Sequence, residues 1–466
     1  MRFRSAWLAI IVAAPLLPAF LASGCSNGSK AAPIVPAVAD RSLSFDATPG
    51  KYIKHIVIVV QENRSFDNLF ATFPNADGAT QGKTHDGKII QLKVKDLAGA
   101  QDINHDWKTF YPEYDNGKMD GFDLCKIAGP NIKCGTYAYQ YVNPSQIQPY
   151  WTLAQQYGLA DHMFQTQGSG SFTAHQDLIA GTTAINSTQS LIDYPSNWTN
   201  WDCDASKQTK TSLMDYHQDY LDKQGPFPCL KYPTGTLADL LDAKKTSWKY
   251  YAPPYTPASP NAGTLWNAFA AIHAVRYGPD WNNISTPETN IFTDITNGQL
   301  PALSWLIPEQ PNSDHPNGKY SPDYGPSWVA QVVNAVGQSP YWNSTAICVL
   351  WDDWGGFYDH EPPPILDKTA DGTVYGLGFR VPLIVISPYV PAGKISHTQY
   401  EFGSILKFVE TTFSLGSLGT TDVRATSIGN MFNFKQKPRP FKVVPAKRSR
   451  QYFLHQPESN LPVDSD

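Results

Sequence analysis

The sequence predicts an α/β fold: a sandwich with a mainly parallel central sheet, flanking helices and long loop insertions. Two observations support this prediction. Several short apolar runs have the length and composition of buried strands, and segments with a helical spacing of apolar residues lie among them. Polar side chains directly follow some of these runs, as expected where parallel strands end at a ligand-binding edge. The 38 Pro and 33 Gly residues are spread along the chain, which indicates long structured loops.

The predicted strands lie at residues 52–60 (YIKHIVIVV), 247–251 (SWKYY), 302–307 (ALSWLI), 345–351 (TAICVLW) and 381–387 (VPLIVIS). The predicted helices lie at residues 66–70, 172–181, 327–337 and 402–413. Ser65 precedes the first of these helices and is a suitable N-cap. The alternation of strands and helices along the chain is what favours a parallel sheet.

The N-terminus carries an export signal. Arg2 and Arg4 precede an apolar stretch at residues 7–22, which predicts a signal peptide over residues 1–24. The stretch ends in LASGC, which resembles a bacterial lipobox with Cys25 as the lipidated residue, although Ala22 stands where leucine is usual. The alternative is simple secretion without a lipid anchor.

The rest of the chain divides by composition. Residues 25–49 are rich in Ala, Pro, Ser and Gly and predict a flexible tether, residues 50–435 predict one catalytic domain, and residues 436–466 predict an extended basic C-terminal tail. The net charge of −5 and a pI near 6.1 argue against a nucleic-acid partner. We therefore expect an exported protein, held in the cell envelope or periplasm as a lipoprotein, or otherwise secreted.

The cysteines other than Cys25 support export. Cys125 and Cys134, and likewise Cys203 and Cys229, lie close together in polar, loop-like regions. Two local disulfides are therefore expected in an oxidising compartment. Cys348 lies within an apolar run and is expected to pack as a small buried hydrophobe.

Two pairs of side chains with oxygen donors come directly after predicted strands. Glu62 and Asn63 follow the first strand, and Asp352 and Asp353 follow TAICVLW. Adjacent carboxylates repel one another unless a cation or a proton lies between them. Carboxylate and amide oxygens suit a hard cation such as calcium, magnesium or manganese, with little need for an imidazole ligand. An acidic pair alone is more often a helix cap or a solvated turn, but two pairs at one sheet edge favour a metal site. His315 follows a third strand toward the same edge.

A candidate nucleophile lies in QTQGSGSFTAHQDLIAGT, residues 165–182. Two glycines permit close backbone approach, and Ser171 then opens the predicted helix, where the positive end of the helix dipole favours phosphate. The simpler interpretation is an ordinary N-cap serine. Thr173 is a competing nucleophile, and His175 is either a site residue or a solvated surface histidine. The chain lacks a GxSxG elbow here, so an α/β-hydrolase triad is not indicated.

Four motifs in this order resemble those of the bacterial phosphoesterase family. They are HIVIVVQENRSFDNLF, NHDW followed by GKMDGF, GSGSFTAHQDLIAGT and WDDWGGFYDH. The resemblance runs from about Lys51 to Phe413 and implies an alkaline-phosphatase-like fold, one metal ion and a Ser or Thr nucleophile. The family contains phosphatidylcholine-type phospholipases C and an acid phosphatase branch.

The resemblance also implies roles for single residues. Glu62 and Asn63 match the family's first pair of metal ligands, and Asp352 and Asp353 match the second. Ser171 matches the nucleophile, although GSFTAHQ replaces the Pro and Asn that usually follow it, which puts the phosphate contacts of that turn in doubt. His105 and His315 match histidines that lie over the phosphoryl group. The role of His360 stays open.

The predicted function is metal-dependent hydrolysis of phosphate esters through a phosphoseryl intermediate, with phospholipase C-like activity. The expected cofactor is one hard divalent ion, and the expected partners are a phosphate ester or phospholipid headgroup and, through Cys25, a membrane. One alternative is an acid phosphatase that acts on phosphomonoesters. A non-catalytic surface lipoprotein predicts a missing ligand or nucleophile, and a sulfatase predicts a C/S-x-P-x-R stretch; the sequence shows neither.

Overall fold

The computed structural model describes residues 49–463, with gaps at 198, 218, 257–260, 317–319, 369–373 and 460–462. The described residues belong to one compact unit, Ala47–Asp466. The predicted signal peptide, Cys25 and nearly all of the predicted tether lie outside the described residues.

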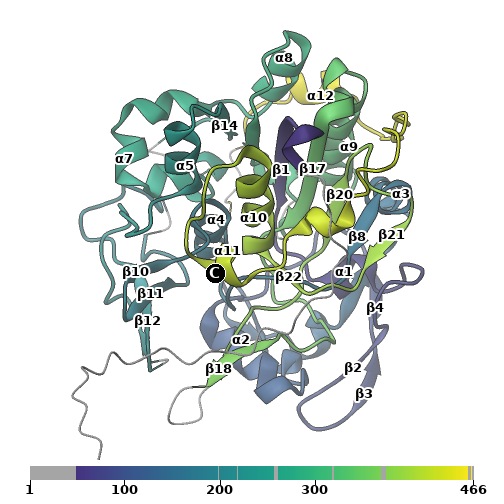
Figure 1. Cartoon of the computed structure of the whole chain (residues 1–466). Coiled ribbons are helices and arrows are strands. Elements are labelled where there is room, and N and C mark those ends of the chain that lie inside the picture. The colour runs from purple at the N-terminus through teal and green to yellow at the C-terminus, as the bar shows by residue number, and fades with distance from the viewer. Residues whose placement is uncertain are drawn as a thin grey trace, which may run out of the picture. The chain divides into compact units, whose positions relative to one another are not determined.

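The central sheet has eight strands in the order β15-β14-β16-β1-β17-β20-β8-β21 (Figure 1). Their bounds are Ile284–Ser285, Trp248–Tyr251, Leu303–Leu306, His55–Gln61, Thr345–Trp351, Leu383–Ile386, Gly158–Ala160 and Lys394–Ser396 in that order. Every neighbouring pair is parallel except the two that involve β20, which runs antiparallel to both β17 and β8. The predicted α/β class with a mainly parallel central sheet is confirmed.

Two strands at the centre of this sheet end at the same level. In the register of β1 with β17, Gln61 lies opposite Trp351, so Glu62 and Asp352 leave the sheet side by side. Both strands are apolar on both faces and almost wholly buried, as expected for parallel strands covered by helices.

The helices cover both faces of the sheet. Helices α4 and α10 pack against each other on one face, where α10 crosses in front of β1 and β17, and α3 and α9 pack against each other on the opposite face (Figure 1). The bounds are α1 Phe66–Phe70, α2 Trp107–Tyr114, α3 Gln148–Gln156, α4 Ser171–Ala180, α5 Leu237–Ala243, α6 Ala262–Leu265, α7 His273–Arg276, α8 Asn290–Thr296, α9 Tyr324–Gly337, α10 Phe402–Phe413, α11 Thr421–Arg424 and α12 Arg450–Leu454. None of the helices in the described ranges combines the length and the apolar character of a membrane span.

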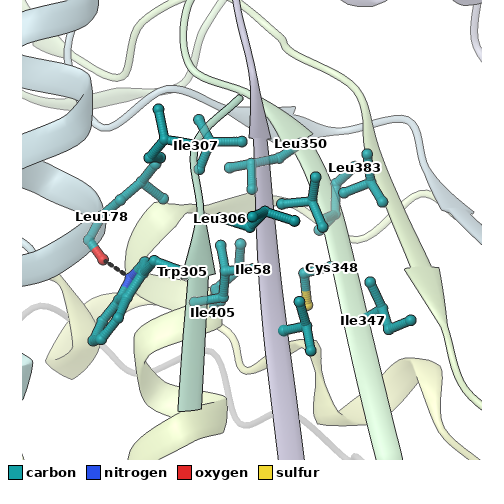
Figure 2. Close-up of a cluster of buried hydrophobic side chains, with 14 of the residues drawn as sticks. Ile58, Leu178, Trp305, Leu306, Ile307, Ile347, Cys348, Leu350, Leu383 and Ile405 are labelled. Carbon is teal, nitrogen blue, oxygen red and sulfur yellow. Dashed lines mark hydrogen bonds between the residues drawn. The ribbon is translucent and has the colours of Figure 1, made fainter. Parts of the chain in front are cut away.

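The core fixes α4 against the sheet. Ile58 of β1, Trp305 of β16 and Ile405 of α10 are fully or almost fully buried together (Figure 2). The indole Nε1 of Trp305 donates a hydrogen bond of 3.1 Å to the carbonyl oxygen of Leu178 in α4. A buried indole N–H needs such an acceptor, and here the acceptor lies on the helix that carries Ser171.

Smaller sheets surround this core. A four-stranded antiparallel sheet comprises β10 (Ala184–Asn186), β11 (Gln189–Ile192), β12 (Ser212–Asp215) and β13 (Tyr220–Leu221). The two-stranded pairs are β2 (Gln81–Lys83) with β3 (Ile89–Gln91), β4 (Lys93–Lys95) with β7 (Gln140–Val142), β5 (Lys126–Ile127) with β6 (Ile132–Lys133), β9 (Met163–Phe164) with β22 (Tyr400–Glu401) and β18 (Ile365–Lys368) with β19 (Val374–Gly376).

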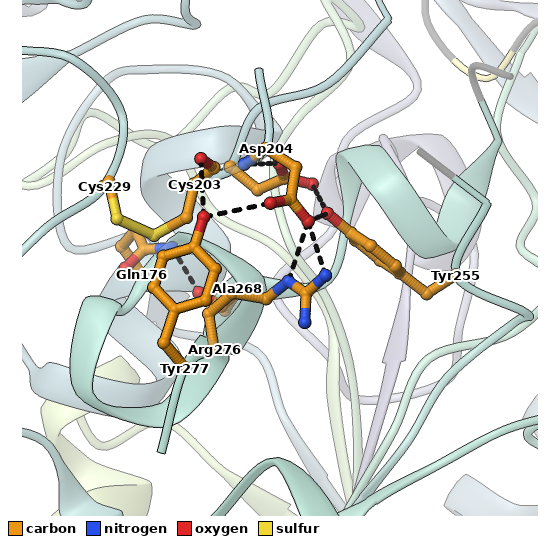
Figure 3. The surroundings of a disulfide bond; sticks show 9 residues. Gln176, Cys203, Asp204, Cys229, Tyr255, Ala268, Arg276 and Tyr277 are labelled. Atoms are coloured by element: carbon orange, nitrogen blue, oxygen red, sulfur yellow. Dashed lines mark hydrogen bonds and ion pairs between the residues drawn. A yellow bond between two sulfur atoms is a disulfide. The ribbon is translucent and has the colours of Figure 1, made fainter. Parts of the chain in front are cut away.

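Both predicted disulfides are present. Cys125 bonds to Cys134 and Cys203 bonds to Cys229, while Cys348 is a buried free thiol, as expected. The second disulfide lies beside a polar cluster in which Arg276 and Tyr255 both donate hydrogen bonds to Asp204 (Figure 3). The hydrogen bonds join the Cys203–Asp204 segment to Tyr255 and to α7, and the disulfide joins the same segment to Cys229.

The C-terminal segment contacts α9. Asn334 donates from its amide to the carbonyl oxygen of Val444 at 2.9 Å, and Arg448 forms an ion pair with Asp323 at 2.9 Å. Residues 436–449 contain neither helix nor strand, and the short α12 follows them. The predicted boundary of the catalytic domain at residue 435 stays a prediction.

Candidate active site

The residues after β1 and β17 form one connected turn. The backbone N–H of Asn63 donates to Asp352 Oδ1 at 2.9 Å, and the N–H of Asp353 donates to the same oxygen at 2.8 Å. Asn63 has a positive φ of 59°, a conformation that Asn tolerates better than most residues. Gly355 packs against it so closely that a Cβ there would lie 2.4 Å from the Asn63 carbonyl oxygen. Backbone hydrogen bonds to Asp352 and the close packing of Gly355 therefore hold the two predicted pairs of oxygen donors together.

Strand alternation determines the face on which these side chains lie. Gln61 donates to the hydroxyl of Tyr150, and Trp351 packs edge-on against the same ring, so both side chains face α3. Glu62 and Asp352, one residue further along each chain, therefore point to the opposite face. That face carries α4.

Helix α4 brings Ser171 to this turn. Ser171 is the first helical residue, and its Oγ donates a hydrogen bond of 3.1 Å to Asp353 Oδ2. Gly170 is the N-cap and offers no side-chain cap, so the ordinary N-cap interpretation of Ser171 is wrong. A Cβ at Gly170 would lie 2.8 Å from the Tyr194 ring and 3.3 Å from His105, which explains the glycine.

The competing hydroxyl is directed elsewhere. Thr173 Oγ1 donates to Ser169 Oγ at 2.8 Å and lies 3.1 Å from the Gly170 carbonyl oxygen. Its hydrogen bonds therefore run back into the preceding turn, whereas Ser171 faces a carboxylate. This geometry favours Ser171 over Thr173 as the nucleophile.

His175 belongs to the site, and the alternative of a solvated surface histidine is wrong. Its side chain is 2% exposed, and Nε2 lies 3.0 Å from Glu62 Oε1 and 3.6 Å from Asp352 Oδ2. Glu62, His175 and Asp352 each offer a ligand atom within 4.8 Å of the others. The expectation that the metal site needs no imidazole is therefore corrected. The missed signal was spacing, because Ser171 and His175 are four residues apart and share one helix face.

The electrostatics of this group favour a cation. Burial, together with the charge of Glu62, raises the pKa of Asp352 well above its ordinary value. Burial lowers the pKa of His175 although the nearby carboxylates of Asp352 and Asp353 oppose this. A neutral imidazole beside two buried carboxylates is a ligand rather than a counter-charge. The site thus needs a proton or a metal ion between its acids.

Asn63 adds an oxygen donor to this group. Its Oδ1 is buried and has no hydrogen-bond partner among the described residues. Its amide nitrogen lies 2.8 Å from His105 Nε2. The side chains present therefore fit a divalent ion, with Glu62, Asn63, His175 and Asp352 as the donors; we call this set the Glu62 centre. Asp353, the fourth predicted ligand, lies beside this set and accepts a hydrogen bond from Ser171, so its role as a metal ligand stays a prediction.

His105 is fixed in one tautomer. Its Nδ1 lies 2.7 Å from the Ile103 carbonyl oxygen, which can only accept, so Nδ1 carries the proton. Neutral His105 then accepts from the Asn63 amide through Nε2. This contact turns the amide nitrogen of Asn63 toward the ring and leaves Oδ1 for a cation. His105 Nε2 also lies 3.6 Å from Asp353 Oδ2, so a protonated ring would face the carboxylate that contacts Ser171.

His315 is fully buried after β16. Its Nδ1 lies 2.6 Å from the Pro316 carbonyl oxygen, and its ring lies 5.6 Å from that of Trp266. These contacts hold the imidazole in place, but its predicted position over the phosphoryl group stays a prediction.

A cavity of about 610 Å³ adjoins the segment before Ser171. One wall is the aromatic face of α2, which begins two residues after His105, and another is the segment at residues 166–168. Phe110 packs so closely on Gly168 that a Cβ there would lie 2.4 Å from its ring. This volume is in the range of small-molecule binding sites.

The fold and this arrangement define the class of protein: an α/β protein with a candidate metal-ligand group of Glu62, His175 and Asp352 and a serine at the start of a helix. The model of the phosphoesterase family matches residues 53–416. The chain belongs to the phosphoesterase family, as predicted.

Relatives named phospholipase C agree with this membership. The chain is 23% identical over 506 residues to a non-hemolytic phospholipase C from Burkholderia pseudomallei, covering 91% of this chain and 66% of that protein, which is just under two thirds of its length. It is 23% identical over 468 residues to phospholipase C B from Mycobacterium tuberculosis, covering 89% and 84%. The crystal structure of a protein in the alkaline phosphatase superfamily from Vibrio parahaemolyticus covers 80% of this chain and 70% of that chain, with 12% identity and a TM-score of 0.34.

Proposed function

We propose that this protein is a metal-dependent phosphoesterase with phospholipase C-like activity and that Ser171 is its nucleophile. One observation carries the proposal: Ser171 Oγ lies at the start of α4, 3.1 Å from Asp353 Oδ2, and His175 lies one turn further along toward Glu62 and Asp352. A nucleophile, an acceptor for its proton and a metal-ligand group thus converge on one point. The relatives named phospholipase C support the same class of reaction.

The Glu62 centre would hold one divalent ion, which when bound supplies Lewis-acid stabilisation of the phosphoryl oxygens. Carboxylate and amide oxygens suit the predicted calcium, magnesium or manganese, and the imidazole of His175 extends this set to zinc. The identity and number of ions are part of the proposal.

The protein's own side chains and backbone N–H groups have separate roles in the proposed reaction. Ser171 Oγ attacks phosphorus while its proton passes to Asp353, to which it already donates. The Oγ–P bond forms, the bond from phosphorus to the leaving alcohol breaks, and the alcohol takes up a proton from Asp353 or from protonated His105. Water then hydrolyses the phosphoryl-serine, which for a phosphodiester substrate still carries the second ester group. The first N–H groups of α4 lack partners within the helix and are positioned to bind the phosphoryl oxygens.

His105 would assist in two ways. In its neutral form it orients Asn63, as the hydrogen bond between them indicates. In its protonated form it would stabilise charge near Asp353 or donate a proton to the leaving alcohol. His315 would act over the phosphoryl group, as the family resemblance implies.

The relatives named phospholipase C favour a phosphodiester over a simple monoester. The cavity of about 610 Å³ is lined neither by Ser171 and Asp353 nor by the Glu62 centre, so it does not decide the substrate. We keep the acid phosphatase as the second candidate because it would use the same catalytic residues.

The test is Ser171→Ala, with Thr173→Ala as the matched control. We expect turnover of p-nitrophenyl phosphorylcholine to fall by roughly a thousandfold or more in Ser171→Ala, since a covalent mechanism loses its first step. Thr173→Ala should keep most of the activity. Acid quenching followed by peptide mass spectrometry should locate phosphorylcholine on Ser171 in the wild type, because the leaving group is p-nitrophenol and the choline ester stays on phosphorus. A Ser171→Ala enzyme with wild-type turnover rejects the assignment. Hydrolysis of p-nitrophenyl phosphate without hydrolysis of phosphatidylcholine would favour the acid phosphatase.

A further inference from the structure

A second group of histidines and carboxylates lies outside the Glu62 centre and shares no residue with it. It consists of Asp77, His162, His360 and Glu361, and we call it the Asp77 cluster. Asp77 follows α1, His162 follows β8, and the other two residues lie in the connection after β17. Because β8 is parallel to β17, these segments leave the sheet at the same edge.

Two imidazoles converge on one carboxylate in this cluster. His360 Nε2 lies 3.3 Å from Asp77 Oδ1, and His162 Nε2 lies 3.3 Å from Asp77 Oδ2. Asp77, His360 and Glu361 each offer a ligand atom within 4.8 Å of the others. Two ligand atoms bound at about 2.0–2.1 Å to one tetrahedral ion lie roughly 3.3 Å apart. Asp77, His360 and Glu361 are therefore close enough to share one ion, and His162 lies against the other oxygen of Asp77.

Buried carboxylates hold the opposite nitrogen of each ring. His360 Nδ1 lies 2.7 Å from Asp67 Oδ2, and His162 Nδ1 lies 2.9 Å from Asp161 Oδ1. The side chains of Asp67 and Asp161 are 0% exposed. Metal-ligating histidines commonly donate their second N–H to a carboxylate in this way, which fixes the ring and leaves Nε2 as the donor to the metal.

The charge around the cluster is strongly negative. The carboxylates are Asp67, Asp77, Asp161, Asp359 and Glu361, and the guanidinium that faces them is that of Arg380, which pairs with Asp359 at 2.8 Å, Asp67 at 3.5 Å and Asp77 at 3.7 Å. His397 also contacts Asp161, at 2.8 Å. Protonated histidines or a dication must balance the excess.

The cluster is open to solvent, in contrast to the Glu62 centre. The side chain of Asp77 is 39% exposed, and those of His162 and His360 are 21% and 23% exposed. An ion has access to the cluster without opening of the core.

We propose that the Asp77 cluster is a second metal site, which binds a divalent ion of the zinc class through Asp77, His360 and Glu361, with His162 beside the second oxygen of Asp77 as the nearest further imidazole. Two imidazoles with two carboxylates suit zinc, cobalt or nickel better than calcium or magnesium. The site is independent of the proposed catalytic reaction and joins the connections after α1, β8 and β17.

The test counts zinc on the full chain after chelation and re-titration, by calorimetry and by elemental analysis. We expect about two equivalents for the wild type and about one for Glu62→Gln, which leaves only the Asp77 cluster. Asp77→Asn and His360→Asn should each lose about one equivalent while keeping the one at the Glu62 centre. Asn at position 360 keeps a nitrogen near Asp67 but removes the distal ligand atom. Asp86→Asn is the matched control, since Asp86 is an exposed acid paired with Lys88.

We expect Asp77→Asn and His360→Asn to lower the zinc affinity of the Asp77 cluster by more than roughly 10- to 100-fold, which is the effect of removing a carboxylate behind a ligating histidine. The zinc equivalent that remains at the Glu62 centre reports that each variant is folded. Wild-type zinc counts in both Asp77→Asn and His360→Asn overturn the proposal. A Glu62→Gln protein that binds no zinc also overturns it, and this measurement needs no variant of the cluster. Loss of hydrolysis in Ser171→Ala tests the proposed function separately, because Ser171 is not part of the cluster.

Discussion

Two pairs of buried carboxylates lie on the same two connections of this molecule and are neutralised differently. Glu62 and Asp352 come directly after β1 and β17, and Asp67 and Asp359 come a few residues further along the same connections. All four side chains are 0% exposed. The first pair faces the imidazole of His175, whereas the second faces the guanidinium of Arg380.

The difference lies in the permanence of the positive charge. The guanidinium of Arg380 is charged at every accessible pH and donates from Nε to Asp359 at 2.8 Å, and His360 Nδ1 lies 2.7 Å from Asp67, so this pair is held by positive and hydrogen-bonding protein groups. Burial lowers the pKa of His175, so its ring does not neutralise Glu62 and Asp352. A pair of acids at a strand end is therefore structural where arginine completes it and a candidate metal centre where a neutral ligand completes it.

The substitution Glu62→Gln is expected to have the largest effect, and it tests whether the first pair of acids binds a metal ion. Loss of a ligand removes Lewis-acid stabilisation worth several kcal/mol, so we expect kcat/KM for p-nitrophenyl phosphorylcholine to fall by roughly a thousandfold. The free energy of unfolding without added metal should stay equal or rise, because the repulsion with Asp352 is removed. Asp86→Asn serves as a control on the surface. An active Glu62→Gln enzyme would place the metal or the chemistry elsewhere.

A second substitution removes the permanent positive charge of Arg380 beside Asp67 and Asp359. Arg380→Met leaves Asp67 and Asp359 buried without their guanidinium, and such a loss costs about 3–5 kcal/mol. Arg380 also donates to the carbonyl oxygens of Asp77 and Asp161, so part of the cost is lost hydrogen bonding. Urea titration should show the decrease, and Arg380→Lys should recover only part of it because lysine lacks the planar fork. Equal stability of Arg380→Met and wild type would contradict the structural role of this pair.

The sequence predicted that Glu62 and Asp352 belong to the site, but it did not predict that His175 completes their group. Glu62 and Asp352 could be placed because an apolar strand followed at once by an acid puts that acid at a known sheet edge. Ser171 followed from a glycine-rich turn before a helical pattern. His175 was left undecided, although four-residue spacing from Ser171 puts both side chains on one helix face. Its burial depends on contact with strand ends more than 100 residues away in sequence.

Arg380 and the antiparallel direction of β20 were beyond sequence reasoning. The run VPLIVIS is apolar whichever way it lies in the sheet, so its direction is set by the connections before and after it. Arg380 precedes this strand and meets Asp67 and Asp359 only because three separate segments meet at one edge. Such pairing leaves no periodic signal in the sequence.

A third pair of buried acids, Glu288 and Glu309, extends the comparison because it is expected to be neutralised by protons. Glu288 and Glu309 are 3% and 7% exposed. Burial, with the charge of Glu309, raises the pKa of Glu288 to about 8, and burial, with the charge of Glu458, raises the pKa of Glu309 to about 7. In the unfolded chain a glutamate titrates near ~4.3, so the folded state holds more protons between about pH 4 and pH 8. Stability should therefore fall as pH rises through this window.

Glu288→Gln removes one of these titrations while keeping the shape of the side chain. We expect the variant to lose less stability than the wild type between pH 5 and pH 8, with a difference on the order of 2 kcal/mol at pH 8. Near pH 5 the wild-type carboxyl is already protonated in the folded state, so the two proteins should be closest there, which provides an internal control. Urea titrations at several pH values measure this. Parallel pH profiles would mean that Glu288 ionises in the fold without cost, and then burial alone would not force the Glu62 centre to take a cation either.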